Sequence, residues 1–193
     1  MLRHLADAGF VVAAANTTQS NADKGQNVLD GVRALIAAND DAASVYHGKI
    51  DTARIATIGH SQGGAAAINA GADPLVTAVL ALEPGPNTGQ DRIHTPTLYL
   101  AGEDDDIVRP AWVRNQYDRS DHVPTWFAEL GGAGHLGIGK EDNGFRPTIT
   151  NWLKYTLYND ETATAIFTGP EWTLETDPAF TETARNAKAR DLN

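Results

Sequence analysis

The sequence predicts an α/β fold in which a mainly parallel sheet is flanked by helices. Short apolar runs containing β-branched residues alternate with longer amphipathic segments, which is the pattern of parallel strands joined by crossover helices. The chain has 193 residues, of which 41% are hydrophobic. This is enough for one well-cored domain, whereas two domains would each bury little surface. We therefore expect a single domain over residues 1–193.

The first half of the chain is expected to form strand, helix, strand and helix. Residues 10–15 follow Gly9 and are apolar, and the run is too short for a helix, which favours a buried strand. Apolar side chains recur at helical spacing over 28–36, and residues 54–58 return to a strand pattern. The alanines of 65–70 favour a helix because alanine has the highest helix propensity.

The second half continues the alternation as far as Asn159. Beyond that residue the chain is rich in Thr, Glu and Ala with weak periodicity, so we expect it to pack irregularly or to fray. The elements expected before it are strands over 78–82, 97–101 and 125–130 and helices over 110–117 and 145–158.

Composition narrows the classes of partner and chemistry. Asp and Glu number 25 against 15 Lys and Arg, which gives a formal net charge of −10. No basic stripe could follow a phosphate backbone, so nucleic acid is not an expected partner. The chain has no cysteine, which excludes disulfides, thiolate nucleophiles and thiolate metal sites.

Hydropathy predicts no membrane span. No apolar run approaches the ~20 residues that a spanning helix needs. Residues 1–10 lack the basic and then apolar layout of a signal peptide. The pattern indicates no particular oligomeric state.

A candidate nucleophile stands between an expected strand and an expected helix, in Gly59-His60-Ser61-Gln62-Gly63. A serine hydroxyl attacks a carbonyl only beside a base and beside donors for the oxyanion, and a sharp strand-to-helix turn provides that exposure. The alternative is an ordinary glycine turn. The flanking elements favour Ser61 as nucleophile, with the backbone N–H of Gln62 at the helix N-terminus as an oxyanion donor.

An acid and a base follow in the order that a serine nucleophile of this type requires. Four consecutive carboxylates occupy 103–106, directly after an expected strand, and one of them is expected to face a histidine. Position in the loop does not choose among Asp104, Asp105 and Asp106. A solvated acidic loop, or a weak calcium site, is the alternative for the other carboxylates.

His135 is the candidate base because it lies in a glycine-rich loop after the strand expected over 125–130, and ligand-binding groups gather at such strand ends. A bland turn with an exposed histidine is the alternative. The remaining histidines precede the acid, occupy the elbow or precede that strand: His4, His47, His60, His94 and His122.

Segments spread over nearly the whole chain resemble the bacterial cutinase and polyester hydrolase family, which includes enzymes that act on poly(ethylene terephthalate). The resemblance implies an α/β-hydrolase fold, ester hydrolysis through an acyl-enzyme, no redox or nucleotide cofactor, and secretion. Aligned through Glu103, it places the catalytic acid at Asp105. The segments that carry the resemblance are 6–12, 48–54, 59–64, 95–98, 131–135, 152–154 and 159–160.

The chain departs from this family pattern around the expected substrate site. Gln62 stands where the family carries methionine, and Pro84 and Gly85 stand where its substrate-binding loop carries an aromatic residue. The resemblance thus assigns substrate contacts to Gln62, Pro84 and Gly85 without the aromatic contact. Of the family's calcium-binding carboxylates only Glu103 is retained, so we expect no required metal.

The chain also opens where family members reach the helix before their central strand. We therefore expect an N-terminally shortened fold without the earlier strands and without the loop that supplies the second oxyanion donor. The leading hypothesis is a serine ester hydrolase of the cutinase or polyester hydrolase type, with a possible action on poly(ethylene terephthalate). The alternatives are a short-chain esterase or lipase, and a catalytically silent truncated scaffold that only binds partners.

Overall fold

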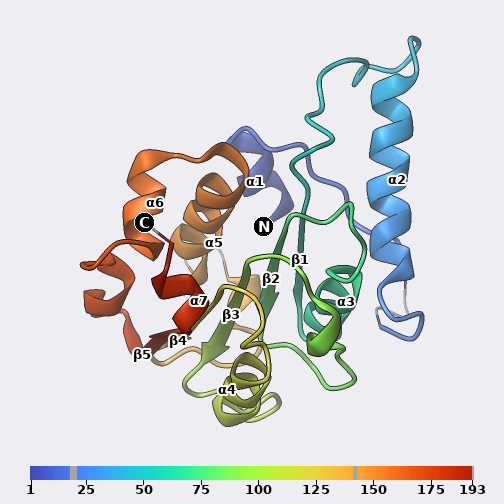
Figure 1. The fold of residues 1–193 in the computed structure, drawn as a ribbon. Helices are drawn as coiled ribbons and strands as arrows, with labels where there is room; N and C mark the ends of the chain where they lie inside the picture. Colours follow the sequence, from blue (N-terminus) through green and yellow to red (C-terminus); the bar gives the residue numbers. More distant parts are fainter. Residues whose placement is uncertain (18–20, 141–142, 193) are drawn as a thin grey trace.

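A five-stranded sheet forms the centre of the computed structural model, which describes residues 1–17, 21–140 and 143–192. The strands follow one another across the sheet in chain order (Figure 1). The first four strands are parallel, and the fifth runs antiparallel to the fourth. They are β1 (Ala56–His60), β2 (Ala78–Leu82), β3 (Thr97–Gly102), β4 (Thr125–Leu130) and β5 (Phe180–Arg185).

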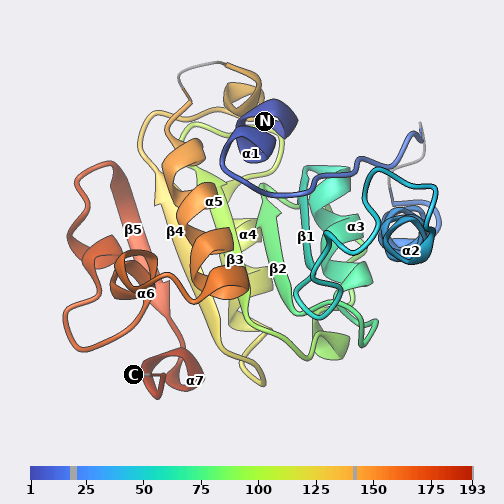
Figure 2. The same cartoon turned by 90° about the horizontal axis from the view of Figure 1, so that it is seen from above.

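Helices cover both faces of this sheet (Figure 2). A π-helical turn, Lys154–Tyr158, continues the fifth helix, and short 3₁₀ turns cover Gln90–Arg92, Gly137–Gly139 and Thr173–Thr176. The α-helices are α1 (Leu2–Asp7), α2 (Gln26–Asp40), α3 (Gln62–Ala70), α4 (Pro110–Asp118), α5 (Phe145–Leu153), α6 (Glu161–Phe167) and α7 (Ala187–Arg190).

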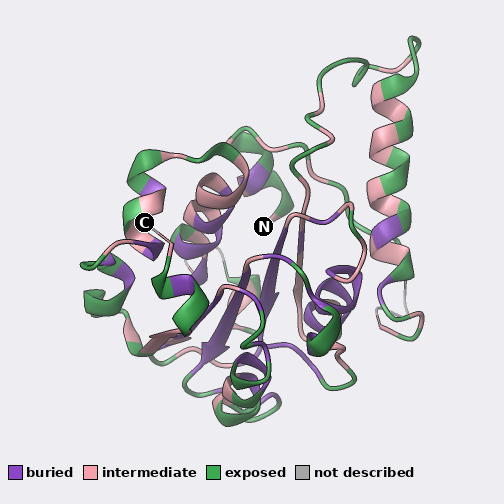
Figure 3. Cartoon of the chain, viewed as in Figure 1, coloured by how far each residue is buried: buried purple, intermediate pink, exposed green. Residues whose placement is uncertain are grey.

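The central strands are buried on both faces because their side chains alternate between two apolar clusters. Leu80, Leu98 and Trp126 are neighbours in register and face α5 and α6. The next side chains along β2 and β3, Ala81 and Tyr99, face α3 and α4. Every residue of β2 and β3 is buried (Figure 3). The predicted α/β class and the parallel order are confirmed.

The strand expected over residues 10–15 is wrong. These residues form no strand, and most of their side chains are exposed. An apolar run becomes a strand only when a neighbour accepts its backbone hydrogen bonds. In the described sheet β1 is an edge strand, and residues 10–15 do not pair with it. Instead, Phe10 stacks on Tyr158, whose hydroxyl donates a hydrogen bond 2.9 Å long to the Gly9 carbonyl.

The expectation of an irregular tail after Asn159 is also wrong. The tail forms α6, β5 and α7, and it adds the antiparallel edge strand to the sheet. Two caps explain the helices: the Asp160 side chain accepts from the N–H of Ala163, and the Asn186 side chain accepts from the N–H of Ala189. The order in this segment comes from capping and from buried aromatic anchors rather than from a long apolar periodicity.

Within residues 1–17, 21–140 and 143–192 the structure has no helix that is both long and apolar enough to cross a membrane.

Candidate active site

Ser61 lies on a sharp turn between β1 and α3. Its backbone adopts φ 55° and ψ −122°, a conformation that L-residues rarely take. Gly59 permits the turn, because a Cβ there would overlap the backbone of Gly63. A Cβ on Gly64 would meet the carbonyl of Leu82 at 3.0 Å, so this glycine lets α3 approach β2. A Cβ on Gly63 meets no described atom within 4 Å, so this glycine is not needed for space.

His135 lies between Ser61 and Asp105. Its Nδ1 is 2.7 Å from Oδ2 of Asp105, and its Nε2 is 3.0 Å from Oγ of Ser61. A carboxylate only accepts hydrogen bonds, so Nδ1 donates, and in the neutral ring Nε2 accepts the proton of the serine hydroxyl. The structure thus brings together the three residues that the sequence singled out, in the geometry of a nucleophile, a base and an orienting acid.

The acidic loop presents one of its carboxylates to the histidine. Asp105 is 3% exposed, and its Oδ1 accepts hydrogen bonds from the backbone N–H groups of Ile107 and Val108. Asp104 and Asp106 are exposed. The geometry therefore distinguishes Asp105 from its neighbours, which loop position alone did not.

The loop that carries His135 is tied to the acidic loop. Oε2 of Glu103 accepts from the N–H of Gly132 at 2.9 Å. The N–H of Asp104 donates to the carbonyl of Ala133 over the same distance. These two hydrogen bonds connect the loop that carries His135 to the loop that carries Asp105, and so they help to fix the base relative to the acid.

The residues expected to contact substrate lie around the turn. Gln62 is the first residue of α3, where backbone N–H groups have no acceptor within the helix. Its side-chain amide packs over Gly85: a Cβ there would be 3.0 Å from Nε2 of Gln62. The N–H of Gly85 donates to the carbonyl of Ser61, and the carbonyl of Pro84 accepts from Gln116. The segment after β2 is therefore anchored to the elbow.

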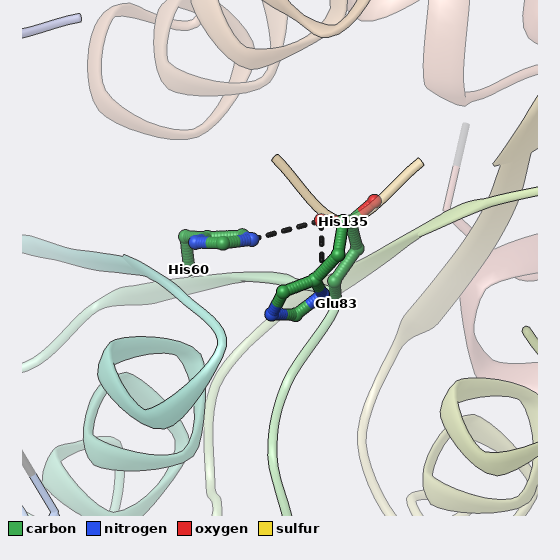
Figure 4. Close-up of side chains that lie close together, drawn as sticks. All are labelled: His60, Glu83 and His135. Carbon is green, nitrogen blue, oxygen red and sulfur yellow. Dashed lines mark hydrogen bonds and ion pairs between the residues drawn. The ribbon is translucent and has the colours of Figure 1, made fainter. Parts of the chain in front are cut away.

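Two ionisable residues that the sequence analysis did not assign to the site also lie in it. Figure 4 shows the carboxyl of Glu83 joined by dashed lines to His60 and to His135. Its Oε2 is 2.9 Å from Nε2 of His60 and 3.7 Å from Nδ1 of His135. Glu83 directly follows β2, so the rule that functional groups gather at strand ends could have found it.

The environment of Glu83 disfavours its charged form. The side chain is fully buried, and burial raises the pKa of the carboxyl above its usual range. The hydrogen bond and charge of His60 oppose this rise in the pKa, and the negative charge of Asp105 adds to it.

His60, Glu83 and His135 form the one set of three groups in the described part of the chain whose geometry could hold a metal ion, with ligand atoms within 4.8 Å of one another. Two histidines and a glutamate do bind zinc in some enzymes. Here Nδ1 of His135 already pairs with Asp105, and Nε2 of His60 lies at hydrogen-bonding distance from Glu83. We propose no metal at these residues.

Comparisons with known proteins identify related sequences. A family model described as PET hydrolase-like matches residues 1–185. Cutinase est2 of Thermobifida alba is 32% identical over 189 residues, covering 90% of this chain and 59% of the relative. Cutinase cut1 of Thermobifida fusca is 30% identical over 164 residues, covering 81% and 50%. Lipase 1 of Moraxella sp. (strain TA144) is 30% identical over 162 residues, covering 81% and 49%.

The chain therefore spans about half to three-fifths of the length of these curated relatives. The family match covers every strand of the sheet as well as Ser61, Asp105 and His135. The mostly parallel sheet is accordingly an α/β-hydrolase sheet, and the chain belongs to the PET hydrolase-like family.

Proposed function

We propose that this chain is a serine carboxylic-ester hydrolase that works through an acyl-enzyme. The observation that carries the proposal is the continuous hydrogen-bonded path from Ser61 through His135 to Asp105, with distances of 3.0 Å and 2.7 Å. Of the three relatives described above, two are named cutinases and one is named a lipase, which supports ester hydrolysis as the reaction class.

In the proposed mechanism Oγ of Ser61 attacks the ester carbonyl carbon while Nε2 of His135 takes the hydroxyl proton. The tetrahedral intermediate collapses, its bond to the alcohol oxygen breaks, and His135 gives that proton to the leaving alcohol. Water then attacks the acyl-serine by the same route and releases the acid. Asp105 keeps Nδ1 protonated and stabilises the imidazolium that forms in each half of the cycle.

The oxyanion of the intermediate is assigned to the backbone N–H of Gln62. This group is at the N-terminus of α3, where the helix dipole and the unpaired N–H favour negative charge. In a well-studied hydrolase a single oxyanion donor is worth on the order of 10²–10³ in kcat. Gln62 is therefore proposed to act through its backbone, while its side chain lies beside Gly85 as part of the substrate surface.

A polyester or another apolar ester is the proposed substrate class. Leu136, which follows the base, is 76% exposed, and Ile107, two residues after the acid, is 56% exposed. Apolar side chains that flank a site and face solvent suit an apolar substrate. A short-chain ester is the alternative. It is supported by Pro84 and Gly85, which stand where the family carries an aromatic residue, and by Gln62, which stands where the family carries methionine. Rates on p-nitrophenyl esters of increasing acyl length, and on polyester films, separate the two.

Secretion of the protein, which the family resemblance implies, stays a prediction.

The first test is labelling of the purified chain with a fluorophosphonate probe, followed by mass spectrometry to locate the adduct. We expect an adduct on Ser61, because only an activated serine displaces fluoride. Ser61→Ala should lose both labelling and turnover of a short acyl ester. Ser44→Ala, which removes a serine hydroxyl outside the site, is the matched control and should keep both.

An unlabelled but folded protein would contradict the proposal and would favour the catalytically silent scaffold. Labelling at another serine would contradict the assignment of the nucleophile. Folding is followed by circular dichroism in each variant, so a loss of activity can be separated from a loss of structure.

A further inference from the structure

Glu83 is an ionisable residue that the proposed mechanism does not use, although it lies inside the site. Its side chain is fully buried, and its backbone has φ 43°, in the left-handed region that favours glycine. Such backbone strain persists where the surroundings hold a residue in place, and it is concentrated at functional sites. A Cβ on Gly102 would overlap Oε1 of Glu83, so a glycine in β3 also makes room for this carboxyl.

The carboxyl approaches the same ring nitrogen that Asp105 holds. Nδ1 of His135 is 2.7 Å from Oδ2 of Asp105 and 3.7 Å from Oε2 of Glu83. The other imidazole, His60, lies 2.9 Å from that same Oε2, and its ring centroid is 4.6 Å from the ring centroid of His135. One oxygen of Glu83 therefore lies at hydrogen-bonding distance from His60 and within ion-pair distance of His135.

The chain order of these residues also fits a second acid. Glu83 lies after Ser61 and before His135, at the carboxyl end of the strand next to β1. Asp105 lies at the end of the following strand, β3. Both carboxylates approach the imidazole from neighbouring strand ends. If Asp105 is lost, Oε2 of Glu83 remains about one ångström beyond hydrogen-bonding distance of Nδ1.

We propose that Glu83 is a positioning residue for the base: its carboxyl bridges the imidazoles of His60 and His135 and acts as a second acid behind His135. This inference rests on the proposed function of the Ser61 site. Nδ1 of His135 is 3.7 Å from Oε2 of Glu83, and a hydrogen bond is about 2.9 Å long. A small shift of the imidazole would therefore let Nδ1–H donate to Glu83 when Asp105 is neutralised.

The charge of Glu83 then couples the base to pH. The groups that face it are His60 from the end of β1, His135 from the loop after β4 and Asp105 from the loop after β3. Because burial raises the pKa of Glu83, the carboxyl is neutral at low pH and gains its charge only as the pH rises. A charged Glu83, whose Oε2 lies 3.7 Å from Nδ1 of His135, stabilises the imidazolium form of that ring by charge attraction.

The test is a double-mutant cycle of Glu83→Gln and Asp105→Asn, read as kcat/KM on a short acyl ester. Asp→Asn in a Ser-His-Asp triad costs about 10⁴-fold when no other acid is present. We expect Asp105→Asn to cost only about 10²-fold here, Glu83→Gln about 10-fold, and the double variant about 10⁴-fold relative to the parent. An equal cost of Asp105→Asn with Glu83 or Gln at position 83 would overturn the proposal.

The second readout is the pH dependence of kcat/KM, whose acid limb reports the pKa of the free base. Glu83→Gln removes a negative charge that stabilises the imidazolium, so its acid limb should move to lower pH. A merely structural role would lower the rate at every pH and leave the limb in place, and that result would overturn the proposal. Asp106→Asn is the matched control, because it removes an exposed carboxylate from the same loop. It should change neither kcat/KM nor the position of the acid limb.

Glu83→Met repeats the cycle with an apolar side chain of similar length. The His60 side chain that loses its partner is 25% exposed and can hydrogen-bond to water instead, so we expect this variant to fold. Fluorophosphonate labelling of the parent separates the two hypotheses. A parent that is neither labelled nor active refutes the proposed function itself. A parent that is labelled and active, with additive variants and an unmoved acid limb, refutes only the role of Glu83.

Discussion

The centre of the sheet differs sharply in packing from the N-terminal flank of the molecule, which consists of residues 10–15 and α2. Every residue of β2 and β3 is buried, whereas α2 buries only Leu29 along its 15 residues. Figure 3 shows the contrast: the central strands are coloured as buried, and α2 stands away from the sheet with intermediate and exposed residues along its length.

An apolar cavity of about 330 Å³ lies in the flank. Its lining includes Phe10 and Val12 from the extended N-terminal segment, Val32 and Leu35 from α2, and Ile58 from β1. Apolar side chains that line a cavity lose part of the contacts that a filled core would give them. The flank is therefore expected to contribute less to stability than the sheet centre, which carries Asp105 and His135 at its strand ends.

The largest expected effect tests the strain at the elbow. Ser61→Gly should abolish turnover, by about 10⁶-fold as in a hydrolase that loses its nucleophile. It should also stabilise the fold by about 1 kcal/mol, because glycine adopts φ 55° without the side-chain strain. Chemical denaturation compares it with Ser61→Ala, which retains the strain and should leave stability unchanged. Equal stabilities of the two variants would show that the turn is not strained.

The next effect tests the sheet centre. Leu98 is fully buried in β3, between Leu80 and Trp126 in register. Leu98→Ala should destabilise the fold by about 2–5 kcal/mol, the range for leucine truncation in a close-packed core. Urea denaturation measures the change. A loss of unfolding free energy below about 1 kcal/mol would mean that the sheet centre collapses into the space left by the Leu98 side chain. The contrast in packing with the flank would then disappear.

Strands could be predicted from the sequence where an apolar run also has neighbouring strands to pair with in the folded sheet. The parallel strands around Leu80 and Leu98 could be predicted because a strand buried on both faces is apolar along its whole length. Residues 10–15 have the same kind of composition, yet they form no strand because pairing depends on a neighbour that local sequence does not specify. The tail after Asn159 was underestimated because caps and single aromatic anchors leave little periodicity.

The candidate site shows the same division. The proximity of Ser61 and His135 could be predicted, because the elbow motif and the order of the residues along the chain are both visible in the sequence. Asp105 was separated from its neighbours only by family resemblance, and the structure now distinguishes it by burial and by its contact with Nδ1. Glu83 was not singled out, although it directly follows a strand. Strand-end position makes it a candidate, but its contacts with His60 and His135 come only from the structure.

The smallest expected effect tests the flank with the same chemical change. Leu35 is half-buried in α2 and lines the apolar cavity, so its methyl groups have few partners to lose. Leu35→Ala should therefore cost less than about 1 kcal/mol in urea denaturation and leave ester turnover unchanged. The matched comparison with Leu98→Ala removes the same atoms from both sites. If both variants lost the same stability, α2 would have to pack against the sheet as tightly as the core strands pack together, and the cavity would be closed in solution.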